Sequence, residues 1–129
     1  CTAKLTYYAA HPQRGQAGSA AAGVLPDFRG IAVHDAYSSY WVYGCAHALC
    51  NVHLLRELRF LVERYAQDWA QELAELLGQM LAATSVARAE EATSLPAELL
   101  AAYRTRYDEL VAAGLAAGRP AVTPARRSA

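Results

Sequence analysis

The side chain whose placement points most directly to chemistry is Asp35. It follows the apolar run GIAVH of residues 30–34, which has the composition of a short buried strand. A carboxylate at the C-terminal end of such a strand is held by the sheet and still faces solvent, which suits a hard divalent cation. Aspartate is also a common turn former at strand ends. Taken alone, this residue favours a turn over a metal site.

A second group of chemistry-bearing side chains is Cys45, His47, Cys50 and His53, spaced as C-x-H-x-x-C-x-x-H. Structural zinc sites usually join two ligand pairs that are a dozen or more residues apart, so that the loop can wrap around the ion. All four residues here fall in one strand-to-helix turn, so we expect no zinc site. Cys50 and His53 are three residues apart where a helix begins, which predicts a structural pair on one helix face.

Three arginines are candidates for contact with phosphate. Arg14 lies in the run HPQRG beside a glycine that would let a backbone approach closely, and Arg56 and Arg59 follow the Cys/His turn. For the latter two, a solvated helix face near Glu57 is the alternative. With 12 basic and 12 acidic residues the net charge is zero, which argues against a free-standing, strongly basic nucleic-acid binder.

Short elements must position these side chains in the first part of the chain. Residues 4–10, KLTYYAA, are predicted to form a strand, and residues 16–24 a short helix or a compact loop. Residues 30–35 and 45–50 are predicted as two further short strands. Because neighbours in a strand point to opposite faces, His34 is expected to be packed rather than catalytic if Asp35 faces solvent.

From Asn51 the hydrophobic residues recur at steps of three and four, which predicts one long amphipathic helix through Met80. The pattern is lost over residues 82–93. Ser94 is then predicted as the N-cap of a second long helix, with Pro96 in its first turn, and Gly118 as its end.

The two long helices are expected to pair as an antiparallel hairpin, because neither could stay folded in water without burying its apolar face. For Trp69 core packing is the prediction, with stacking on a DNA base as the alternative. The side chains predicted to face each other are Leu58, Leu61, Tyr65 and Trp69 on one helix, and Tyr103, Tyr107 and Leu110 on the other.

Composition favours an α/β protein that is mainly helical. Hydrophobic residues make up 54% of the chain, but 29 of them are alanine and only one is isoleucine, so any sheet must be small. No run of 18 apolar residues and no secretory signal is visible, which predicts a cytoplasmic protein without a membrane partner. Three cysteines favour thiols or metal ligands over a disulfide framework. The chain begins with Cys rather than Met, so we expect a piece of a longer polypeptide.

The runs LTYYAAHPQRG, LPDFRGIAVHDAYSSY and HALCNVHLLREL, in this order, resemble the transposases of insertion sequence family 66. The catalytic domain of that family belongs to the RNase H-like DDE group. The resemblance extends from residue 4 to near residue 118 and is strongest in VHDAYSSY followed by CNVHLLREL. It implies a partial RNase H-like core over residues 1–50, a helical insertion over residues 51–118, and a disordered linker or tail over residues 119–129.

The resemblance also implies roles for single residues. Asp35 corresponds to the second of three acidic metal ligands, and Cys50 and His53 to the C-x-x-H segment of DDE enzymes with helical insertions. The first and third acids of the family would lie outside this chain. The complete enzyme would use two Mg²⁺ ions to cleave DNA and transfer strands at transposon ends and target, in a monomer or a homo-oligomer.

This chain alone is then expected to be inactive, since two of the three acids are missing. Two other interpretations stay open. The chain is a non-catalytic DNA-binding or interaction remnant of a transposase, or it is a small zinc-binding module.

Overall fold

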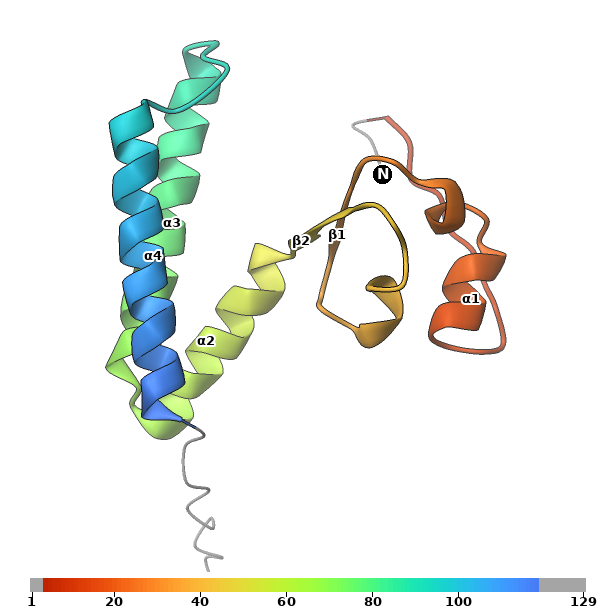
Figure 1. Cartoon of the computed structure of the whole chain (residues 1–129), viewed down its shortest axis with the longest axis horizontal. Coiled ribbons are helices and arrows are strands. Elements are labelled where there is room, and N and C mark those ends of the chain that lie inside the picture. The colour runs from red at the N-terminus through yellow and green to blue at the C-terminus, as the bar shows by residue number, and fades with distance from the viewer. Residues whose placement is uncertain (1–3, 119–129) are drawn as a thin grey trace, which may run out of the picture. The chain divides into compact units, whose positions relative to one another are not determined.

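The computed structural model describes residues 4–118 of the chain, whose contacts form two compact units, Cys1–Leu54 and Leu55–Ala129. The described part is α/β and mostly helical, as the composition predicted. Its elements in chain order are α1 (Gln16–Ala21), the short 3-10 helix η1 (Leu25–Asp27), β1 (Ile31–His34), the 3-10 helix η2 (Ser38–Tyr40), β2 (Ala46–Leu49), α2 (Asn51–Tyr65), α3 (Asp68–Ala89) and α4 (Ala97–Ala117) (Figure 1).

The first unit contains a parallel sheet made of β1 and β2. Ile31 pairs with Ala46 at one end and His34 with Leu49 at the other. The Cys50 N–H donates to the His34 carbonyl at 2.8 Å and extends the ladder past the end of β1. The strands predicted over residues 30–35 and 45–50 are confirmed, as is a helix within residues 16–24. Because the strands are parallel, both of their C-terminal ends lie at the same edge.

The strand predicted over residues 4–10 is wrong. The segment has no regular structure, and its side chains are exposed, Tyr8 to 86%. Threonine and tyrosine are typical of a half-buried pleated surface, but composition cannot supply the neighbouring strand that a sheet needs. In the described residues, β1 and β2 pair with each other.

The single helix predicted from Asn51 to Met80 is also wrong, because the chain turns between α2 and α3. Ala66 adopts a left-handed conformation at φ 50° and Gln67 is extended. The Gln67 carbonyl accepts from the Ala70 N–H at 3.1 Å, and its side-chain oxygen accepts from the Trp69 indole at 3.0 Å. The apolar spacing continues in phase across this turn, so periodicity alone does not reveal it.

The predicted loss of helix over residues 82–93 is wrong for most of its length, since α3 continues to Ala89. The segment is rich in alanine, whose helix propensity is high without an amphipathic pattern. Ser94 is not the cap of the next helix: Pro96 occupies the N-cap position of α4 and makes no side-chain capping bond. Gly118 ends α4 at φ 66°, as predicted. The tail predicted over residues 119–129 lies outside the described residues.

An antiparallel helical hairpin is present, formed by α3 and α4, which run side by side in Figure 1. The Tyr103 hydroxyl donates to the Gln79 carbonyl at 3.4 Å, and Arg106 forms an ion pair with Glu72. The predicted helix pair is wrong in part, because Leu58, Leu61 and Tyr65 belong to the separate helix α2. Contact of these three side chains with α4 stays a prediction. The buried side chains of α3 and α4 are Ala70, Leu73, Leu76, Leu77 and Leu110.

Trp69 is half-buried and packs against Gly114 of α4. A Cβ atom added at Gly114 would lie 2.9 Å from two carbons of the indole, which is closer than real Cβ contacts. A methyl group here must displace a rigid ring, and such overpacking costs about 1 to 3 kcal/mol. Core packing is thus confirmed as the structural role of this tryptophan.

We expect Gly114→Ala to lower the melting temperature of the chain, because the clash with the Trp69 ring outweighs the gain in helix propensity. Gly78→Ala is the matched control, since Gly78 lies in α3 with nothing within 4 Å of an added Cβ. That substitution should stabilise by up to about 1 kcal/mol. Thermal melts followed by circular dichroism compare the two, and equal stabilisation by both would contradict the packing of Trp69 on α4.

Among residues 4–118, no helix combines the length and the apolar character needed to cross a membrane.

Candidate active site at the end of β1

Asp35 is exposed and directly follows β1 at the C-terminal edge of the sheet. Its Oδ1 accepts a hydrogen bond of 3.1 Å from the Tyr37 N–H, which makes it a turn former. This bond uses one carboxylate oxygen and leaves Oδ2. The turn-forming role of Asp35 is therefore present, and it leaves an oxygen that could bind a cation.

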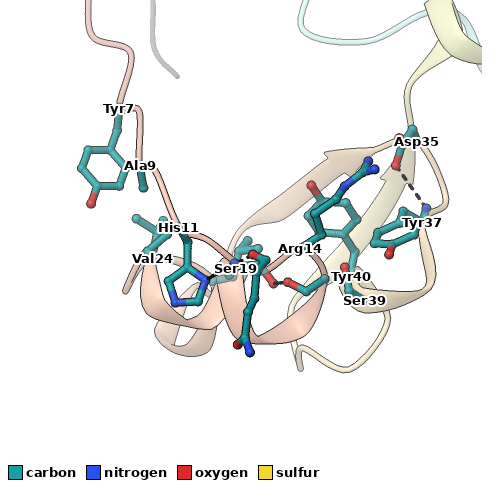
Figure 2. A pocket seen from close by; sticks show the side chains of 15 residues that line it. Tyr7, Ala9, His11, Arg14, Ser19, Val24, Asp35, Tyr37, Ser39 and Tyr40 are labelled. Atoms are coloured by element: carbon teal, nitrogen blue, oxygen red, sulfur yellow. Dashed lines mark hydrogen bonds between the residues drawn. The ribbon is translucent and has the colours of Figure 1, made fainter.

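A pocket of about 600 Å³ lies beside Asp35 and within the first unit. Arg14 belongs to its lining, and in Figure 2 the Arg14 side chain extends toward Asp35 and Tyr40. Segments before α1, α1 itself and the connection between β1 and β2 all contribute to the wall. The other side chains of chemical interest in the lining are Tyr7, His11, Ser19, Tyr37 and Ser39.

The wall of this pocket depends on two glycines and one hydrogen bond. Gly15 has φ +79°, a conformation that side chains rarely adopt, and it turns the chain from Arg14 into α1. A Cβ at Gly18 would lie 2.5 Å from the Gln13 carbonyl oxygen, so only glycine lets the two backbones approach. The Ser19 and Tyr43 hydroxyls are 2.9 Å apart and tie α1 to the β1–β2 connection. The loop that presents Arg14 is thereby held in place.

The side chains of Cys45, His47, Cys50 and His53 lie in different surroundings. The His47 Nδ1 lies 3.1 Å from the His34 Nε2, and Cys45 is buried. Cys50 is half-buried, and both it and Cys45 are free cysteines rather than partners in a disulfide. His53 is half-buried in the first turn of α2. The predicted contact between the side chains of Cys50 and His53 stays a prediction.

Arg56 and Arg59 are exposed on α2 and belong to the second unit, whereas Asp35 and Arg14 belong to the first. A contact of these two arginines with DNA stays a prediction. Within the described residues, no group of three or more His, Cys, Asp or Glu side chains is placed to hold a metal ion. Asp35 is therefore at most one ligand of such a site.

His34 is packed beneath the Asp35 turn, as the alternation of the strand predicted, with 6% of its surface exposed. Its ring stacks on Tyr40 and meets the edge of Trp41. Sequence reasoning did not find this aromatic cluster, because the contacts depend on how the β1–β2 connection folds back. The nearest signal is the density of aromatic residues in YSSYWVY, residues 37–43.

The fold and the site together describe an α/β protein in which a carboxylate, Asp35, and an arginine, Arg14, line one pocket at the end of a strand. Over residues 1–125 the chain matches the model of the Transposase IS66 family. The chain belongs to this family of transposases, so the resemblance drawn from its motifs is confirmed, and a transposase-related function follows. No curated protein matches the chain, and no solved structure does.

Proposed function

We propose that this chain forms part of the catalytic domain of a DDE transposase, an RNase H-like enzyme that cleaves DNA and transfers the cut strand. The observation that supports this function is the shared pocket of Asp35 and Arg14 at the C-terminal edge of a parallel β pair. Ligands of open α/β sheets bind outside this end of the strands. Family membership adds DNA as the class of substrate.

Asp35 is proposed as one ligand of Mg²⁺. Its exposed carboxylate is a hard oxygen donor, and the bond from the Tyr37 N–H fixes the orientation of that carboxylate. When bound, two such ions about 3.5 to 4 Å apart stabilise the attacking and leaving oxygens of an in-line displacement. Because one carboxylate cannot hold such a pair, we propose that acidic residues beyond those described complete the site.

Arg14 is proposed to bind a DNA phosphate in the same pocket. A guanidinium presents a planar set of donors that matches phosphate geometry, and it keeps its charge at any physiological pH. The Gly15 turn directs the chain so that Arg14 lines the pocket together with Asp35. In this role Arg14 fixes the position of the strand, while Asp35 serves the chemistry.

We also propose that residues 1–50 act as the catalytic core and residues 51–118 as a helical insertion. The contacts of the structure separate near this point, at Leu54 and Leu55, and α3 pairs with α4. The hairpin would then serve as a compact element attached to the core through α2.

Arg14→Gln in the complete transposase is expected to weaken binding of transposon-end DNA. Loss of one phosphate contact should reduce the slope of log K against log salt concentration by about 1. Arg29→Gln is the matched control, because Arg29 is an exposed arginine of the same unit and is not part of the pocket lining. Fluorescence anisotropy over a salt series measures both variants. Identical slopes for the two variants would rule out a phosphate contact specific to Arg14.

A further inference from the structure

Two histidines from neighbouring strands are hydrogen-bonded to each other beneath the Asp35 turn. The Nε2 of His34 in β1 lies 3.1 Å from the Nδ1 of His47 in β2. The register pairs His34 with Leu49 and Ala32 with His47, so the two rings meet diagonally across the sheet. Among the described residues, His34 is also the polar side chain that is buried.

The hydrogen bonds around the pair determine where the protons lie. The His34 Nδ1 accepts from the Ala36 N–H at 3.1 Å, so this nitrogen carries no proton and Nε2 is the donor. The His47 Nδ1 must then accept. At the other end, the His47 Nε2 lies 3.1 Å from the Tyr43 carbonyl, which can only accept. In each ring Nδ1 therefore accepts a hydrogen bond and Nε2 donates one.

This chain of hydrogen bonds ends at Ala36, whose backbone conformation is strained. Ala36 has φ 67°, a conformation that costs energy for any residue except glycine and persists only when its surroundings hold it. Its N–H is held by His34, and its carbonyl accepts from the Trp41 indole at 3.3 Å. The Trp41 ring in turn packs on His47 with ring centroids 4.9 Å apart. Both backbone groups of Ala36 thus depend on this cluster.

Ala36 lies between Asp35 and Tyr37, so its conformation decides whether the Tyr37 N–H reaches the Asp35 carboxylate. We propose that His34 and His47, through this chain of hydrogen bonds, are positioning residues that hold the Asp35 carboxylate in the orientation it needs at the pocket. This role rests on the proposed function of Asp35, because its orientation matters only if it binds a ligand.

Nuclear magnetic resonance on the chain itself tests the geometry without any activity. Two-bond nitrogen–proton correlations should show both imidazoles as Nε2–H tautomers, and His47→Gln should shift the Ala36 and Tyr37 amides relative to the parent chain. A His34 or His47 ring with its proton on Nδ1, or Ala36 and Tyr37 amides that do not respond to His47→Gln, would overturn the proposal.

Variants in the complete transposase test the consequence for catalysis. His34→Leu should lower the rate of DNA cleavage by about 10- to 100-fold, as loss of a residue that orients a metal ligand does, with DNA affinity unchanged. His34→Asn keeps an acceptor near the Ala36 N–H and should recover part of the rate. His47→Gln keeps a donor toward the Tyr43 carbonyl but has no acceptor at the position of the His47 Nδ1. It serves in place of His34→Leu if that variant fails to fold, and it should lower the cleavage rate similarly.

The outcomes separate the two proposals. If Asp35→Asn abolishes cleavage and folded His34→Leu or His47→Gln cleaves normally, the positioning role is wrong. If Asp35→Asn cleaves normally, the proposed function is wrong, and the tautomers and amide shifts still decide whether the histidines hold the turn.

Discussion

Asp35→Asn in the complete transposase is expected to abolish Mg²⁺-dependent DNA cleavage and strand transfer while DNA binding is retained. Asparagine has the shape of aspartate, and its side-chain oxygen can still accept from the Tyr37 N–H, so the turn should persist. What is lost is the negative charge that a hard cation requires. Removal of that charge from a phosphate-binding pocket should leave DNA affinity equal or higher. Gel analysis of labelled transposon-end DNA measures cleavage, and anisotropy measures binding.

Asp27→Asn is the matched control, because Asp27 is the other exposed aspartate of the first unit and does not line the pocket. It should cleave at the normal rate. Normal cleavage by Asp35→Asn would instead favour the non-catalytic interpretation, in which the chain binds DNA without contributing a metal ligand. The chain by itself should leave the DNA uncut with either Mg²⁺ or Mn²⁺, and cleavage by it would show that one carboxylate suffices.

The residues of the candidate site could be predicted from the sequence, but the fact that they line one pocket could not. Asp35 was evident because an apolar run ends there, and Arg14 because a glycine follows it. That both line one pocket depends on the backbone at Gly15 and on the bond between Ser19 and Tyr43. These are contacts between segments distant in the chain, and periodicity or spacing carries no information on them.

The contact between His34 and His47 could not be predicted from the sequence either. His47 was considered as a zinc ligand because of its neighbours in sequence, whereas its bond to His34 depends on the diagonal register of two strands. The spacing of one segment cannot reveal that register. The alternation argument needed only local geometry, so it correctly predicted that His34 is packed.

The sequence correctly predicted that this part of the chain is helical, but the predicted number of helices was wrong for a similar reason. Leu58, Leu61, Tyr65 and Trp69 keep helical spacing through the turn at Ala66, so a single apolar stripe was read as one helix. The turn depends on Ala66 in a left-handed conformation and on the Gln67 side chain, which donates to the Tyr65 carbonyl and accepts from the Trp69 indole. Because alanine, unlike glycine or asparagine, is not typical of a left-handed conformation, the sequence did not indicate a turn at Ala66.

Leu73→Ala is expected to destabilise the second unit by about 2 to 5 kcal/mol, because the side chain is 4% exposed and its removal leaves a cavity between packed helices. For a unit of this size the melting temperature falls by roughly 4 to 8 °C for each kcal/mol. Leu73 lies among the buried leucines of α3, which α4 covers with Leu110. The variant should therefore melt far below the parent chain when followed by circular dichroism.

Glu72→Ala is the control, one position away on the same helix. Glu72 forms an ion pair with Arg106 of α4, but both side chains are 48% exposed, and such pairs contribute little in water. Its loss should change stability by no more than about 1 kcal/mol. A large effect of both substitutions would mean that the ion pair contributes to the stability of the hairpin as much as apolar packing does. Equal and small effects would mean that α3 and α4 do not pack through Leu73, because a leucine at a helix interface cannot lose most of its side chain without cost.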